Sequence, residues 1–391
     1  MEGVGATQAP EHGAADRKAS AGRVRLVSLD LLRGLAVMGM ILVNAAAGMF
    51  YSAEAPVFPL LLHVPWDGLT LADLVFPAFL MMVGVSIPFS IARGSASGGA
   101  GATPLARIGA RTLRLLAIGF LLSNLAWFAD FGAGAWRLFG VLQRIGLVYG
   151  ACALLYLWLS PRAIAVVVAA TLLLYWPLAL LPALDGLPND LWIRGHNFVA
   201  SVDRVLLGRG DHNYVKGPAG YDPEGLLGTL PAIAHGLIGV LIGLFLRARP
   251  GRSSAGMLAG AGAAMLVAGL AWGAVFPIVK DIWSSSFVLV TCGVTTLLLA
   301  GLHAGVDGRA QPPAGRIAAI VLAFGSNAIA AYVLHMVTSD VIGWDLLQLP
   351  YRWTQTFLPG EVASLLPVLL YIALIGWAML WLRRKGWFIK V

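Results

Sequence analysis

The chain has 391 residues, of which 59% are hydrophobic and only 12% are charged, and its formal net charge is +8. Soluble domains carry about 25% charged residues, so this composition excludes an ordinary soluble protein and indicates a membrane protein. Basic residues in membrane proteins mostly set topology, so the positive charge does not predict a nucleic-acid partner. Cys152 and Cys292 lie in apolar runs and are predicted to be ordinary buried thiols.

Apolar runs of about 20 residues, the length that crosses a bilayer, recur along most of the chain. Residues 1–22 precede the first run, are polar and rich in Ala and Gly, and are predicted to be a disordered tail. Residues 23–391 are predicted to form one all-α transmembrane domain, a polytopic bundle of ten or eleven membrane helices. The ten spans are expected at residues 28–50, 69–92, 108–128, 138–159, 163–183, 226–246, 255–277, 284–303, 316–342 and 362–383.

The distribution of Lys and Arg predicts the orientation of this bundle. Of the 27 basic residues, 18 flank one side of the expected spans and 7 flank the other. By the positive-inside rule the richer side is cytoplasmic, which places both termini inside. We therefore predict an integral protein of the bacterial inner membrane, in which residues 184–225 form a long extracytoplasmic loop that caps the outer face.

Ionisable side chains within spans are costly, so they indicate a functional site by default. Asp30 and Arg33 stand three residues apart on the first span and can pair, either to set topology or as an entry site for an anionic group. Asn44 lies deeper in the same span, where an amide also serves as a contact between helices.

The stretch HVPWDGLTLAD brings His63, Asp67 and Asp73 to the start of the second span. Asp67 has a structural alternative, since an aspartate at this position can cap the helix. Asp73 lies further in and is the stronger functional candidate.

The later spans add further polar side chains. An arginine as deep as Arg144 needs an anionic partner or a wet cavity, and Asp67, Asp73 and Glu224 are the candidate partners. Asn327 and His335 stand eight residues apart on the expected ninth span and would share a face. Three more candidates stand at the mouth of the eighth span, namely Lys280, Trp283 and Ser284. The chain contains no HExxH, CxxC or GxSxG motif, so a metal site and a serine hydrolase are both disfavoured.

The motifs DLLRG, ILVN, HVPWDGLTLADLVFPAFLMMVGVSI, GVLQRIGLVY, YDPEGLLGTLPAI, PIVKDIWSSSFV and GSNAIAAYVLH occur in this order. Together they resemble the transmembrane acyltransferase family of heparan-alpha-glucosaminide N-acetyltransferase, over about residues 24–385. The resemblance implies acetyl-CoA as a cytoplasmic co-substrate and an extracytoplasmic amino sugar or glycan as acceptor. It also implies that His63 is the active-site histidine and Asn44 its partner.

A histidine suits this chemistry because it can take a proton from an amine near neutral pH or carry the acetyl group itself. A direct attack and a ping-pong route both remain open. The predicted catalytic residues are His63, Asn44, Asp73 and Asp67. The predicted substrate or CoA contacts are Asp30, Arg33, Arg144, Glu224, Lys280, Trp283, Ser284, Asn327 and His335. From their charge and position alone, we expect the CoA phosphates to meet Arg33, Arg107, Arg111 and Arg114.

The expected partners are the lipid bilayer, acetyl-CoA, the amino-sugar acceptor and, as an open alternative, a second copy of the chain in a homodimer. Two other functions use the same residues. A transporter of a small solute or a proton-coupled substrate would employ the buried acids and histidines as a relay. A scaffold protein would tolerate apolar residues in their place.

Overall fold

The computed structural model describes residues 26–91, 103–129, 135–209, 212–307 and 315–389. Within these ranges the chain is helical and its only β-type pairs are two isolated bridges. The predicted all-α fold class is therefore confirmed. The tail predicted at residues 1–22 lies outside the described ranges.

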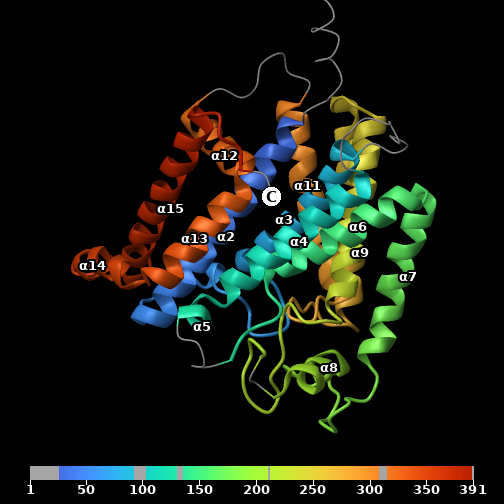
Figure 1. Cartoon of the computed structure of the whole chain (residues 1–391), viewed down its shortest axis with the longest axis horizontal. Coiled ribbons are helices and arrows are strands. Elements are labelled where there is room, and N and C mark those ends of the chain that lie inside the picture. Colours follow the sequence, from blue (N-terminus) through green and yellow to red (C-terminus); the bar gives the residue numbers. More distant parts are fainter. Residues whose placement is uncertain (1–25, 92–102, 130–134, 210–211, 308–314, 390–391) are drawn as a thin grey trace, which may run out of the picture.

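The helices follow one another in up-and-down order (Figure 1). Their bounds are α2 (Val27–Ala53), η2 (Pro59–Leu61), α3 (Leu71–Ser90), α4 (Pro104–Ser123), α5 (Leu125–Ala129), α6 (Val141–Trp158), α7 (Pro161–Ala179), α8 (Phe198–Leu207), α9 (Thr229–Ala248), η3 (Arg252–Ser254), α10 (Ala255–Gly273), α11 (Ser285–Val306), α12 (Arg316–Ser326), α13 (Ala328–Val341), α14 (Asp345–Thr354) and α15 (Gly360–Arg384).

Each of the ten expected spans coincides with a helix or, for the ninth, with the pair α12 and α13, but not all of them qualify as membrane spans. In the described part of the chain, eight helices are long and apolar enough to cross a bilayer, and the pair α12 and α13 makes nine if it counts as one span. The expected third span, α4, is not apolar enough to count as a membrane span, because it carries Arg107, Arg111 and Arg114.

The expected ninth span is not one continuous helix. It breaks at Asn327, where α12 and α13 meet at 84°. Asn327 is the N-cap residue of α13, so its eight-residue spacing to His335 runs along α13, but the two side chains hold different partners: Asn327 binds the backbone of the C-terminal segment, and His335 contacts Asn44 and Tyr371.

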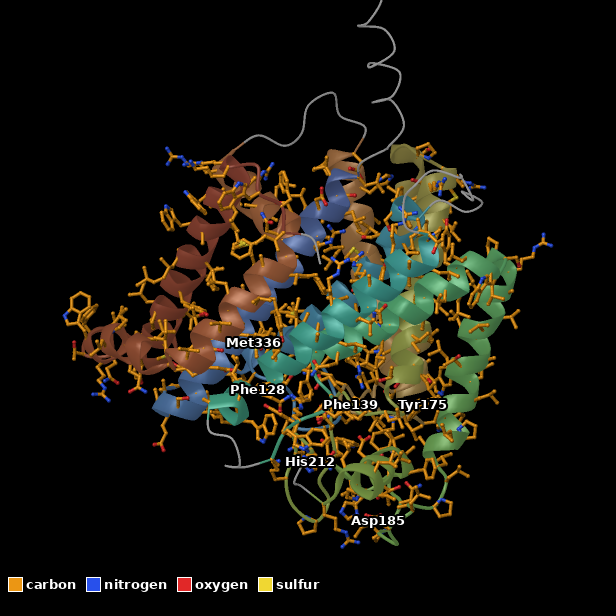
Figure 2. The ribbon with its side chains drawn as sticks, viewed as in Figure 1. Phe128, Phe139, Tyr175, Asp185, His212 and Met336 are labelled. Carbon is orange, nitrogen blue, oxygen red and sulfur yellow. The ribbon has the colours of Figure 1, made fainter. Side chains whose placement is uncertain are left out.

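The two ends of the bundle differ in character. We call the end where α2 begins and α15 finishes the basic end, because Arg247, Arg249, Arg316 and Arg383 gather there. The opposite end, which we call the loop end, carries α8 and the long connections (Figure 1). His212 and Asp185 lie in this layer of loops, beyond the ends of the spans (Figure 2).

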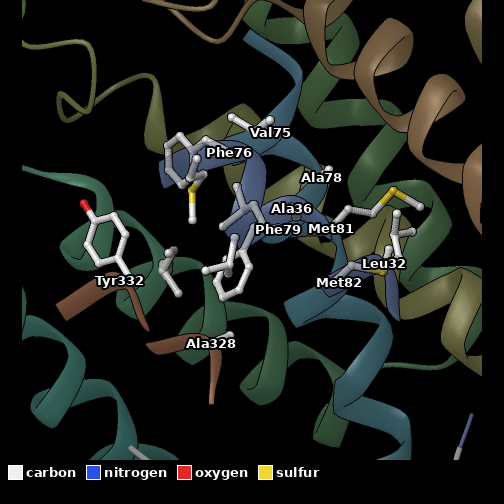
Figure 3. Packing of buried hydrophobic residues seen from close by; sticks show 14 of the residues in the cluster. Leu32, Ala36, Val75, Phe76, Ala78, Phe79, Met81, Met82, Ala328 and Tyr332 are labelled. Atoms are coloured by element: carbon white, nitrogen blue, oxygen red, sulfur yellow. The ribbon is translucent and has the colours of Figure 1, made fainter. Parts of the chain in front are cut away.

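Helix α3 lies at the centre and is the most buried span, with 78% of its apolar window inside the protein. Phe76, Phe79 and Met82 of α3 pack with Leu32 and Ala36 of α2 (Figure 3). On its other side α3 meets α9 through glycines, since a Cβ at Gly84 would lie 2.0 Å from the carbonyl oxygen of Gly236. Such small-residue contacts let membrane helices approach closely. The central helix is thereby held on both sides, which fixes the residues at its two ends.

Candidate active site

A histidine and a carboxylate meet where the chain enters α3. His63 Nδ1 lies 2.7 Å from Asp73 Oδ1, and Asp73 Oδ2 accepts hydrogen bonds from the backbone N–H of Thr70 at 3.1 Å and of Val64 at 3.3 Å. Asp73 stands at the third position of α3 and completes a capping box with Thr70. The sequence thus uses one carboxylate both to start the helix and to hold the histidine.

The burial of the pair determines which nitrogen of the histidine is available. The Asp73 side chain is 1% exposed, whereas that of His63 is 43% exposed. A buried carboxylate accepts a hydrogen bond, so Nδ1 of His63 carries the proton and Nε2 keeps its lone pair. In this tautomer, Nε2 is the ring nitrogen that can accept a proton.

Lys280 completes this cluster from a distant part of the sequence. Its Nζ lies 3.2 Å from both ring nitrogens of His63 and 3.8 Å from Asp73 Oδ1. The loop that carries Lys280 is held by Asp67, whose Oδ1 accepts a hydrogen bond from the N–H of Ile278 at 2.8 Å. Asp67 therefore anchors a loop, and the alternative that it caps α3 is wrong, since Thr70 occupies that position.

Asn44 belongs to a second polar cluster, inside the bundle. Its Nδ2 lies 3.2 Å from Nε2 of His335, and Nδ1 of His335 lies 3.0 Å from the hydroxyl of Tyr371. That hydroxyl is in turn 2.6 Å from Oγ1 of Thr338. Among the described contacts, Asn44 makes no direct hydrogen bond to His63, so the structure brings Asn44 together with His335.

A cavity of about 390 Å³ opens toward the basic end, between α2, α3, α4, α6 and the α12–α13 junction. Arg33 and Arg111 line it together with Ser86 and Tyr149. Arg33 donates to Ser86 Oγ at 2.8 Å and pairs with Asp30 at 3.3 Å, and the Arg111 guanidinium stacks 4.4 Å from the ring centre of Tyr149.

Two of the four arginines expected to meet CoA thus line the cavity, and the other two do not. Arg107 and Arg114 lie on exposed faces of α4, and Arg114 donates to its own helix at the carbonyl of Ala110. The helical period does not separate these arginines, because positions 107, 111 and 114 lie on one face of α4, and of the three only Arg111 is in the cavity lining.

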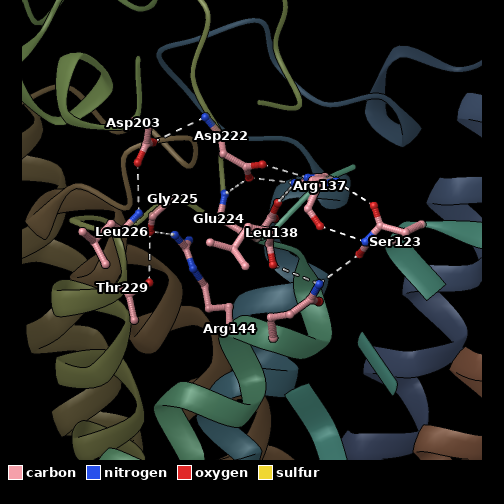
Figure 4. A network of polar contacts seen from close by, with 12 residues as sticks. Ser123, Arg137, Leu138, Arg144, Asp203, Asp222, Glu224, Gly225, Leu226 and Thr229 are labelled. Atoms are coloured by element: carbon pink, nitrogen blue, oxygen red, sulfur yellow. Dashed lines mark hydrogen bonds and ion pairs between the residues drawn. The ribbon is translucent and has the colours of Figure 1, made fainter. Parts of the chain in front are cut away.

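At the loop end Arg137 binds two carboxylates that sequence reasoning did not assign to it. It donates to both oxygens of Asp222 at 2.8 Å and to Glu224 at 2.5 Å (Figure 4). Burial opposes the charge on Arg137, but the two carboxylates outweigh it and raise its pKa. Burial likewise works to raise the pKa of Glu224, but the positive charges of Arg137 and Arg144 lower it on balance. The three side chains form a buried ion cluster that ties the long loop to the spans.

Asp203 of α8 lies next to this cluster. Its carboxylate accepts from the backbone N–H of Leu226 at 3.1 Å and of Asp222 at 3.4 Å. Burial, together with the negative charge of Asp222, raises the pKa of Asp203 to about 7.

Arg144 has no carboxylate within ion-pair distance among the described residues. It donates to the carbonyl of Gly225 at 3.1 Å, and its guanidinium lies 5.0 Å from the ring centre of Trp283. The expected direct pairing with Asp67, Asp73 or Glu224 is therefore wrong, because Asp67 and Asp73 hold other partners and Arg137 takes Glu224. No signal in a single sequence marks Arg137, which lies in a loop 85 residues from Asp222.

Several other expected contact residues have structural partners. Trp283 is 1% exposed and packs between Phe76 and Phe287. Ser284 caps α11, since its side chain accepts from the N–H of Phe287. Asn327 binds the backbone of the C-terminal segment at Trp387 and Ile389.

The long loop expected at residues 184–225 packs on the spans as a layer around α8, within its described parts. Arg204 is buried and donates to Asp185 at 2.6 Å. The rings of His212 and Trp136 are tilted against each other with their centres 4.2 Å apart, and His212 Nδ1 lies 2.8 Å from the carbonyl oxygen of Trp136. In the described ranges, no group of three or more His, Cys, Asp or Glu side chains is placed to hold a metal ion.

These features define a polytopic helical membrane protein with a His–Asp pair at one end and a basic cavity at the other. Comparison with known sequences confirms the resemblance predicted from the motifs. The model of the family described as "Heparan-alpha-glucosaminide N-acetyltransferase, catalytic" matches residues 25–203, which include Asn44, His63 and Asp73. The chain is thus similar to an N-acetyltransferase family.

Two curated relatives carry the name heparan-alpha-glucosaminide N-acetyltransferase. The human protein is 26% identical over 84% of this chain and 54% of its own length, and the mouse protein is 28% identical over 86% of this chain and 56% of its own length. The chain therefore spans about half the length of the curated relatives it matches.

Proposed function

We propose that the protein transfers an acetyl group from acetyl-CoA to the amine of an amino sugar or glycan on the other side of a bacterial inner membrane. The observation that carries this proposal is the His63–Asp73 pair at the loop end, in which Asp73 holds Nδ1 and Nε2 has Lys280 Nζ as its neighbour at 3.2 Å. The basic end then faces the cytoplasm, in keeping with the charge asymmetry, and both termini lie inside.

The chemistry assigned to His63 follows from its geometry. The acceptor amine attacks the acetyl carbon, Nε2 takes the proton from the amine, and the C–S bond breaks as the proton passes to the CoA sulfur. In a ping-pong route the same atom carries the acetyl group as an acyl-imidazole. Lys280 Nζ lies 3.2 Å from Nε2, and the acceptor amine takes the place of this ammonium group when it gives its proton to Nε2.

The donor is assigned to the basic cavity. Arg33 and Arg111 offer the guanidinium groups that phosphates prefer, and Tyr149 offers an aromatic face. The site residues span a long path, since Ser86 and Asp73 are 13 residues apart on α3, which corresponds to about 20 Å of helix. A donor that carries its acyl group on a long arm, as acyl-CoA does, fits this separation.

Asn44 lies between the two ends. It stands 11 residues beyond Arg33 on α2, or about 16 Å toward the loop end. His335 holds one N–H of its amide, and the second N–H remains to bind the acetyl carbonyl oxygen as negative charge develops there. All these groups come from a single chain, so the proposed reaction does not require a homodimer.

The test uses sealed vesicles of known orientation. Radiolabelled acetyl-CoA is supplied on the side of the membrane that the basic end faces, and candidate amino sugars are supplied on the side that the loop end faces. We expect labelled N-acetyl product with the wild type, none with His63→Ala, and a raised KM for acetyl-CoA with Arg111→Met. Leu113→Met, an exposed change on the same helix, is the matched control. Passage of the amino sugar across the membrane in the absence of acetyl-CoA would instead identify a transporter.

A further inference from the structure

The C-terminal segment Trp387–Ile389 folds back onto the bundle and brings Ile389 to the basic cavity. Helix α15 ends at Arg384, and Gly386 with a φ of +70° turns the chain back toward α12. Glycine adopts this left-handed conformation without strain, and the N–H of Trp387 then bonds to the carbonyl of Leu382 at 2.9 Å. Ile389, at the far end of the segment, is one of the residues that line the cavity.

One side chain holds the segment in place. The Oδ1 of Asn327 accepts from the N–H of Ile389 at 2.9 Å, and its Nδ2 donates to the carbonyl of Trp387 at 3.2 Å. Asn327 is fully buried, whereas Trp387 and Ile389 are about half exposed, so loss of the two hydrogen bonds leaves the buried amide without partners, which is costly. An amide suits this position because it donates and accepts at once, which neither aspartate nor alanine does.

The position of Asn327 connects the segment to the cavity. Asn327 is the residue at which α12 and α13 meet, and its neighbours Gly325, Ser326, Ala328 and Ile329 all line the cavity. One wall of the cavity therefore consists of the α12–α13 junction together with the C-terminal segment, which Asn327 binds to this junction. The break that overturned the predicted ninth span thus has a structural consequence at this site.

We propose that residues Trp387–Ile389 form a wall of the CoA-binding site and that Asn327 is the positioning residue that holds this wall closed. This inference rests on the proposed function, since it takes the basic cavity as the donor site. It assigns Asn327 a role through the C-terminal segment, in place of the direct substrate contact expected from the sequence.

The experiment measures the Kd of CoA by calorimetry for the purified full chain and for two kinds of change. Asn327→Ala frees the segment, and termination of the chain after Gly386 removes it. Loss of the two hydrogen bonds predicts a Kd raised about tenfold or more for each variant. Because both changes disable the same wall, the combined variant is expected to bind CoA no more weakly than the truncated chain.

Asn124 provides a matched control, because it uses its amide in the same way elsewhere. At the break between α4 and α5 it accepts from the N–H of Arg137 at 2.6 Å and donates to the carbonyl of Arg137 at 2.9 Å. It lies at the loop end, so Asn124→Ala is expected to leave the Kd of CoA unchanged. Within the segment, Ile389→Ala is expected to weaken CoA binding and Phe388→Ala is not, since Phe388 is absent from the cavity lining.

The outcomes separate the two proposals. If the wild type binds CoA and the Kd is unchanged in the truncated chain and in Ile389→Ala, the proposal that the C-terminal segment forms a wall of the CoA site is overturned. The acetyltransferase proposal then remains intact. An equal loss of affinity in Asn124→Ala and Asn327→Ala also overturns it, because the effect would then be general destabilisation. A wild type that binds neither CoA nor acetyl-CoA overturns the proposed function and this inference with it.

Discussion

Replacement of Asp73 by asparagine tests the His–Asp pair most directly. The carboxylate holds His63 Nδ1 with one oxygen and two backbone N–H groups with the other. Asparagine keeps one oxygen for the backbone, so its NH₂ group must face the imidazole. Nδ1 of His63 must then accept a hydrogen bond, which moves the ring proton to Nε2 and removes the base.

The magnitude follows from these two effects. A positioned general base contributes about 10²–10⁴ in rate, so we expect kcat/KM of Asp73→Asn to fall by about 10³. The helix cap survives with its oxygen, so stability is expected to change by no more than about 1 kcal/mol. The assay is acetyl transfer in vesicles, with thermal melting of the same preparation in detergent.

Asp67→Asn is the matched control. It makes the same chemical change six residues away, where the amide oxygen can still accept from the N–H of Ile278. We expect its activity to stay within about threefold of the wild type. If Asp73→Asn keeps more than a tenth of the wild-type kcat/KM, or if Asp67→Asn loses as much as Asp73→Asn, the assignment of the base is refuted.

Two further predictions concern the loop end. The folded protein holds a proton on Asp203 up to about pH 7, above its ordinary pKa of 3.8. The stability from that proton is full below about pH 4 and is lost as the pH rises through 7, about 4 kcal/mol in all. Asp203→Asn should therefore melt above the wild type at pH 8 and equal it below about pH 4. Arg137→Met leaves Asp222 and Glu224 unpaired and should cost about 3–5 kcal/mol in unfolding free energy. Arg194→Gln, at a half-exposed pair, should cost no more than about 1 kcal/mol, and comparable melting of the two arginine variants would contradict the buried cluster.

The sequence predicts features that repeat locally and misses those that depend on distant pairs. Helix α3 and its acid were predictable because an apolar run that contains an aspartate is unusual. The partners of that acid were harder to predict, because Asp73 binds a histidine ten residues earlier and also Lys280, which lies far along the chain. The Arg137 cluster could not be predicted, because a loop arginine carries no periodic signal.

The break at Asn327 was missed for a different reason. The segment GSN has turn-forming residues, but the apolar runs on both sides are each helical and together have the length of one span. Hydropathy reports that a segment is buried and does not report its direction. The 84° bend becomes visible only once α12 packs on α2, where a Cβ at Gly34 would lie 2.0 Å from the carbonyl oxygen of Val321.

Helix α3 links the two parts of the proposed site and limits the donors that it accepts. The cavity lining on α3 runs from Phe79 to Ser90, and Phe79 still lies six residues, or about 9 Å, from Asp73. A donor fixed by Arg33 and Arg111 therefore reaches His63 only with an extended arm. Acetyl phosphate, which carries its acetyl group directly on the phosphate, should bind the cavity without supporting transfer. Rapid transfer from acetyl phosphate would mean that the reacting groups meet inside the cavity, and His63 would then lose its assigned role.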